Sequence, residues 1–150
     1  MTLQGLTKDG KAYFEKLARL ESVEIRVGFF EGQEYPDGTA VAQVAAENEL
    51  GDSNRPARPF MRQTFENHEG ELNKALTHVD RVVAEGGDVD AALDETGQFL
   101  VGLMQTEIVD GGFAPNSPAT VAQKGSSQPL IDTGFMRQSV SYRIVENKEQ

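Results

Sequence analysis

The chain has 150 residues, of which 38% are hydrophobic, with a formal net charge of −10 and no cysteine. This length fits one domain spanning 1–150, because compact domains cluster near ~100 to 150 residues. The lack of cysteine excludes disulfides, thiolate metal sites and thiol nucleophiles. The negative charge argues against a nucleic-acid binder, although an acidic wall would let DNA slide past without sticking.

The first ten residues lack a basic segment followed by an apolar run, and no stretch approaches the ~18 apolar residues of a membrane span. We therefore expect a protein made and used in the cytosol, with no membrane among its partners.

The N-terminal part predicts a helix followed by a strand. Between Lys8 and Leu20, apolar residues recur at helical spacing, with most charged residues on the other face. From Ser22 to Phe30, apolar residues alternate with Glu24, Arg26 and Gly28, as in a half-buried strand.

A turn and a second helix are expected next. Gly32 to Gly38 is rich in turn residues, and Thr39 is positioned to cap a helix that reaches Glu49. Gly51 would end that helix at the C′ position. The segment Asp52 to Pro59, with two prolines, predicts a further break.

The middle of the chain predicts two longer helical stretches. The first opens at Phe60 and ends at Gly86-Gly87, and the second is capped by Asp88 or Asp90 and runs to about Val109. Gly97 within the second costs ~1 kcal/mol relative to alanine. We therefore expect another helix to pack closely there.

The C-terminal part predicts a loop, a short helix and a strand. Asp110 to Leu130 is a long Pro/Gly segment typical of a binding loop, with one short helix from Pro118 to Lys124. A last helix is capped by Asp132 or Thr133, and Ser139 to Val145 is a strand that should pair with the first one. The expected fold class is α+β, with a small antiparallel or mixed sheet packed by several helices.

No catalytic or metal site stands out. The run Gly51-Asp52-Ser53-Asn54 superficially matches the nucleophile block of lipase-like serine hydrolases, but both histidines, His68 and His78, precede the C-terminal position where such enzymes keep their base. A plain turn at Ser53 is the favoured interpretation, with a hydrolase as the alternative. The histidine spacing does not suit zinc, so no cofactor is expected.

The order of charges suggests a protein interface. Between Glu31 and Asp52 there are six acidic residues and no Lys or Arg, and three arginines then follow before the next acid. These are either solvated surfaces or the two sides of a contact between neighbouring subunits of a ring. The candidate interface residues are Arg55, Arg58, Phe60, Arg62, Glu47, Glu49, Asp52 and Lys124.

Two segments together resemble the tail-completion or head-tail joining (neck) proteins of long-tailed bacteriophages. Residues 41–65, VAQVAAENELGDSNRPARPFMRQTF, are similar to that family's helix, glycine break and Arg-Pro-Phe-x-Arg block. Residues 115–144, PNSPATVAQKGSSQPLIDTGFMRQSVSYRI, are similar to its second block, although Asn116 stands where relatives often have an aromatic residue or leucine. The blocks cover 55 of the 150 residues.

The resemblance implies a structural virion protein without catalysis, a tail-completion, tail-terminator or head-tail joining subunit. It would form a homo-oligomeric, hexameric ring that meets neighbouring neck and tail-tube proteins, with DNA passing through it. It would be assembled in the host bacterial cytoplasm and end in the virion. A non-virion adaptor or chaperone of tail assembly remains a third possibility.

Overall fold

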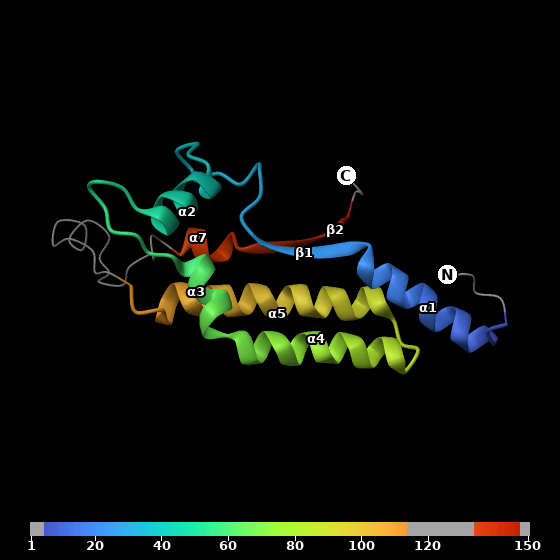
Figure 1. The fold of residues 1–150 in the computed structure, drawn as a ribbon. Coiled ribbons are helices and arrows are strands. Elements are labelled where there is room, and N and C mark those ends of the chain that lie inside the picture. The colour runs from blue at the N-terminus through green and yellow to red at the C-terminus, as the bar shows by residue number, and fades with distance from the viewer. Residues whose placement is uncertain (1–4, 114–133, 148–150) are drawn as a thin grey trace.

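A computed structural model describes residues 5–113 and 134–147 of the chain (Figure 1). The elements are α1 (Lys8–Glu21), β1 (Val23–Gly28), α2 (Val41–Leu50), α3 (Phe60–Asn67), α4 (Glu69–Ala84), α5 (Val89–Asp110), α7 (Phe135–Gln138) and β2 (Ser141–Glu146). The predicted α+β class is confirmed. No helix within these ranges is both long and apolar enough to cross a bilayer.

The two predicted strands form one antiparallel sheet. Its register runs from Val23 opposite Glu146 to Gly28 opposite Ser141, so the first and last strands of the chain lie side by side. Alternation in β1 places Val23, Ile25 and Val27 toward the helices and leaves Glu24 and Arg26 exposed. The expected pairing of the two strands is therefore confirmed.

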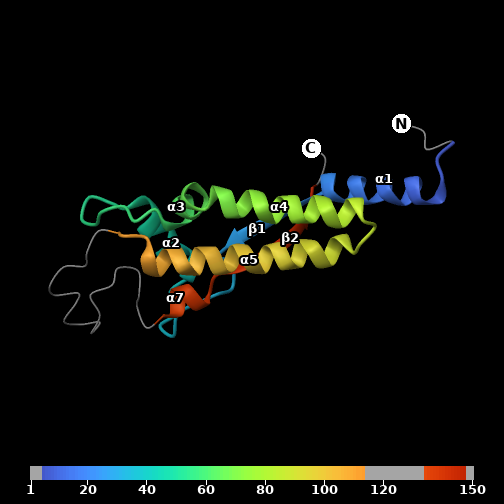
Figure 2. The ribbon, with the colours of Figure 1, turned by 90° about the horizontal axis from the view of Figure 1, so that it is seen from below.

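The body of the molecule is long and layered. The sheet lies along one side of α5, and α4 runs antiparallel beside α5, as Figures 1 and 2 show. The helix α1 lies at one end of this body, whereas α2, α3 and α7 gather at the other end.

The buried side chains divide into two clusters along α5. One, at the end formed by α2, α3 and α7, contains Val41, Ala45, Phe60, Met104, Ile108, Met136 and Val140. The other, toward the end that bears α1, contains Val79, Val83, Val89, Ala92 and Leu93. Met136 of α7 is therefore part of the core, and Phe135 packs partly buried against the first cluster.

Close approach at Gly97 occurs, but the neighbour is a strand and not a helix. A Cβ on Gly97 would lie 2.5 Å from Cε2 of Tyr142, on β2, and closer still to Cδ2 of the same ring. The Tyr142 hydroxyl donates to Asp94 Oδ1 at 3.2 Å. The tyrosine therefore fixes the sheet to α5, and the lack of a side chain at Gly97 makes room for it.

Helix boundaries follow the predictions except at three places. Asp88 caps α5 by accepting from Ala91 N at 3.1 Å, as predicted. Thr39 does not cap α2, because the N-cap position is Ala40, which makes no side-chain capping bond. The stretch that opens at Phe60 is two helices, since His68, with φ of −119°, separates α3 from α4.

The third difference concerns α7, whose N-cap is Gly134 in the left-handed region at φ 74°. The positive φ suits glycine, which has no Cβ to clash. The caps predicted at Asp132 or Thr133, the helix from Pro118 to Lys124 and most of the loop from Asp110 to Leu130 lie outside the described residues.

Candidate interaction surfaces

The break between α2 and α3 forms a tight elbow, residues 51–59. Gly51 ends α2 as predicted, with φ of 66°, and a Cβ there would lie 2.5 Å from the backbone nitrogen of Ala57. The backbone N–H of Arg58 donates to the carbonyl of Asn48 at 2.6 Å, which folds the elbow back onto α2. Glycine is therefore required at 51 both for its dihedral angles and for the space.

Glu49 joins the two helices of the elbow. Its carboxylate accepts the backbone N–H of Met61 at 2.9 Å and of Arg62 at 3.0 Å, in the first turn of α3. Pro59 is the N-cap of α3 and makes no side-chain capping bond. Glu49 thus supplies the negative charge that a helix N-terminus favours.

Within one subunit, Arg55 already contacts two of the acids proposed for a neighbour. Its guanidinium lies 3.2 Å from Glu47 and 2.9 Å from Asp52. A backbone N–H bond from Asn54, and then the Arg55 side chain, hold the pKa of the Asp52 carboxyl below its usual value. A lowered carboxyl pKa stabilises the fold above its unfolded-state pKa, and this contribution disappears as pH falls through the folded-state pKa.

The remaining candidates differ in exposure. Phe60 is fully buried and packs edge-to-face on Phe29 at 6.0 Å between ring centroids, so it contributes to the core of the subunit. Burial, followed by the charge of Arg55, lowers the pKa of the partly buried Arg58. The Arg62 side chain is 68% exposed, and its Nε lies 3.6 Å from Oε1 of Glu66. Lys124 lies outside the described residues.

Glu49→Ala is expected to lower the free energy of unfolding by about 1 to 2 kcal/mol, because two helix N–H groups lose their acceptor. The matched control on the same helix is Glu47→Ala, which removes an exposed ion pair of about 0 to 1 kcal/mol. Urea denaturation of both variants measures the difference. An equal loss from both would contradict the capping role.

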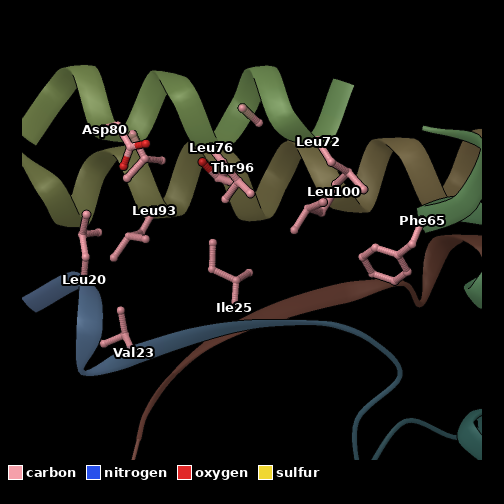
Figure 3. Close-up of a pocket in the computed structure, with 12 residues that line it drawn as sticks. Leu20, Val23, Ile25, Phe65, Leu72, Leu76, Asp80, Leu93, Thr96 and Leu100 are labelled. Atoms are coloured by element: carbon pink, nitrogen blue, oxygen red, sulfur yellow. The ribbon is translucent and has the colours of Figure 1, made fainter. Parts of the chain in front are cut away.

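A second surface is an apolar groove of about 440 Å³ between β1 and the α4–α5 hairpin. Figure 3 shows Leu20, Val23 and Ile25 approaching it from α1 and β1, opposite side chains of α4 and α5. Leu72, Leu76, Leu93 and Leu100 line the helical side, and Phe65 lies at one end. Leu76 and Phe65 are 56% and 44% exposed, so the rim of the groove remains open to solvent.

A buried polar cluster, which the sequence did not predict, holds α3 and α4 to α5. Glu107 is only 4% exposed, and its carboxylate accepts from Asn67 Nδ2 at 2.9 Å. Its other oxygen lies 3.0 Å from His68 Nε2. His68 is thus mostly buried, with its side chain 20% exposed. The sequence did contain one indication that Glu107 is buried, because it lies between Met104 and Ile108 on the apolar stripe of α5.

The surroundings of Ser53 give little support to the alternative of a serine hydrolase. Ser53 is exposed in the turn of the elbow, and both histidines face carboxylates of α5. His68 lies beside Glu107, and His78 Nε2 is 3.4 Å from Glu95. Within residues 5–113 and 134–147, no three His, Asp or Glu side chains are grouped so as to hold a metal ion.

Comparisons of this chain with known protein families, with curated proteins and with solved structures find no significant match. The resemblance to bacteriophage neck proteins therefore depends on the two sequence blocks alone.

Proposed function

We propose that the chain is a structural virion protein of a tailed bacteriophage. It forms a ring at the head–tail junction or tail end, as a tail-completion, tail-terminator or head-tail joining subunit, and it is needed for virion assembly. It is assembled in the host bacterial cytoplasm and then resides in the neck or tail of the virion. The observation that carries this proposal is the occurrence of both family-like blocks, in order, around a long helix.

The described parts of the two blocks meet in one place. Val41, Ala45 and Phe60 come from the first block, and Met136 and Val140 come from the second. All five pack with Met104 and Ile108 of α5, at the end of the body opposite α1. Segments that resemble one family thus build one common core, which is what a shared fold requires.

The residue pattern of the first block has a structural explanation without catalysis. Gly51 makes the elbow, Phe60 fills the core, and Arg62 projects from the first turn of α3 into solvent. Exposed arginine suits contacts with a carboxylate of a neighbouring protein, because its planar guanidinium fixes orientation as well as charge. This favours a subunit that presents geometry and charge to a ring neighbour over a hydrolase.

Arg62→Glu is expected to leave the circular dichroism spectrum unchanged and to yield particles with unjoined heads and tails. One exposed ion pair contributes only about 0 to 1 kcal/mol, but a ring repeats the contact in every subunit. The matched control is Arg26→Glu on β1, an arginine that is also mostly exposed. Electron microscopy of lysates complemented with each variant is the measurement.

Normal infectious particles from Arg62→Glu would show that Arg62 does not contribute to the interface. Equal loss of joined particles from Arg26→Glu would show a general sensitivity to charge and contradict the assignment of this surface. A transient adaptor or chaperone would be distinguished by its absence from purified virions.

A further inference from the structure

The helix α1 is only half attached to the body. None of its residues is buried by the described part of the chain. Its C-terminal half is held by Lys16 Nζ, which donates to the Gly86 carbonyl at 2.6 Å, and by Arg19, which pairs with Asp90 at 3.1 Å. Its N-terminal half projects beyond the turn between α4 and α5 (Figure 1).

This projecting half, residues 8–14, carries an aromatic pair and two lysines. The rings of Tyr13 and Phe14 meet edge to face at 5.6 Å, and Tyr13 is 40% exposed. The side-chain ammonium groups of Lys8 and Lys11 form no hydrogen bond or ion pair with residues 5–113 or 134–147. The segment thus presents apolar and basic groups together at one tip of the molecule.

The apolar groove offers the complementary surface. Its exposed rim residues, Leu76 and Phe65, are apolar, and Asp80 is the charged residue among those that line it. Within the described ranges, the Asp80 carboxylate has no hydrogen-bond or ion-pair partner. An occupant with an apolar side chain and a nearby cation would therefore satisfy both parts of the groove.

The distribution of charge favours a second copy of this chain as that occupant. Residues 69–110 hold ten acidic and two basic residues, a net charge of −8 out of the −10 of the whole chain. The helix α1 has four basic and three acidic residues, so it is weakly positive. Attraction between α1 and the hairpin of another subunit is thus favourable, whereas two hairpins repel each other.

A subunit cannot place its own Tyr13 in its own groove. Leu20 already lines the groove, and Tyr13 lies seven residues further along the helix, about 10 Å away at 1.5 Å per residue. Tyr13 lies instead beside residues 83–86 of its own subunit, with which it lines a shallow pocket. Because α1 runs outward from Leu20, the exposed part of Tyr13 can reach only the groove of another molecule.

We propose that residues 8–14 of one subunit dock on the apolar groove of a second copy. Tyr13 packs against Leu76 and Phe65, and Lys8 or Lys11 faces Asp80. The contact uses different surfaces on the two subunits, so its repetition closes a ring when the rotation allows. The ring rests on the proposed function, whereas the contact itself requires only self-association.

Because the chain lacks cysteine, single introduced cysteines can map this contact. Asp9→Cys lies one turn before Tyr13 on the same stripe of α1, and Leu76→Cys lies on the groove rim. The two variants, one of them tagged, are mixed and oxidised so that a mixed disulfide reports an intermolecular contact. The control replaces Asp9→Cys with Ser53→Cys, which is also exposed but lies in the elbow.

The expected result is at least ten times more mixed disulfide with Asp9→Cys than with Ser53→Cys, and its loss when Tyr13→Ala is added to the Asp9→Cys chain. If Leu76→Cys does not fold, Phe65→Cys replaces it on the other side of the rim. Equal yields from both donors, or no mixed disulfide at millimolar protein, would overturn the docking. Failure of the disulfide experiment would not contradict the proposed virion role. Conversely, absence of the chain from virions would not contradict a contact measured between purified subunits.

Discussion

Replacing Glu107 with alanine is expected to lower the free energy of unfolding by about 2 to 4 kcal/mol. The carboxylate is 4% exposed and is the shared partner of Asn67 and His68 at the junction of α3 and α4. Its removal leaves the partly buried His68 and the exposed Asn67 without their acceptor and opens a cavity on the apolar stripe of α5. Urea denaturation followed by circular dichroism measures the loss.

Two controls separate the buried cluster from a general effect of charge on α5. Glu107→Gln keeps an acceptor oxygen and should cost less than half as much as the alanine variant. Glu95→Ala removes the exposed partner of His78 on the same pair of helices, and its effect should stay within about 1 kcal/mol. A loss from Glu107→Ala as small as that from Glu95→Ala would contradict the role assigned to this cluster.

Gly97→Ala is expected to destabilise the fold by about 2 to 3 kcal/mol, because the new methyl group would collide with the ring of Tyr142. Alanine normally stabilises a helix relative to glycine by about 1 kcal/mol, so the predicted sign is opposite to helix propensity. The cause is the close approach of β2 to α5.

Gly102 provides the matched control for Gly97, since it lies on the same helix and a Cβ there would meet nothing within 4 Å. Gly102→Ala should therefore stabilise the protein by about 0.5 to 1 kcal/mol in the same urea experiment. The same glycine-to-alanine change, at two positions five residues apart, should therefore change the free energy of unfolding in opposite directions. Stabilisation by both would show that Tyr142 moves aside at little cost and would contradict the packing account.

Local sequence patterns predicted much of the fold. Alternation defined β1, the spacing of apolar residues defined α5, and Gly51 and Asp88 marked helix ends, because these signals depend on neighbours in the chain. The pairing of the first and last strands also followed from their patterns.

Features that depend on contacts between distant residues were missed. The break at His68 has no proline, and Gly70 in the first turn of α4 was too weak a signal to predict it. The break occurs where Asn67 and His68 reach Glu107 of α5. The cap of α3 comes from Glu49, twelve residues before Met61, so no capping motif is visible. The groove exists only because two layers leave a gap between them.

The candidate interface was partly visible in the sequence. The charge order named Arg55, Arg58 and Arg62 together, and it could not show that Arg55 pairs within its own subunit with Glu47 and Asp52 whereas Arg62 is largely exposed. Nor could it separate Phe60, which fills the core, from surface residues. The exposure of each of these side chains is set by how the elbow packs, and the order of charges along the chain carries no information about that packing.

Quantitative mass spectrometry of purified virions, from the genome that encodes this chain, tests the central claim most directly. The proposal predicts the chain in virions at a fixed stoichiometry, about six copies per particle for a hexameric ring. The same stoichiometry should survive a high-salt wash that strips adhering host protein. Absence from infectious, DNA-filled virions, with the chain abundant in the lysate, would contradict a structural role and leave a transient assembly factor in its place.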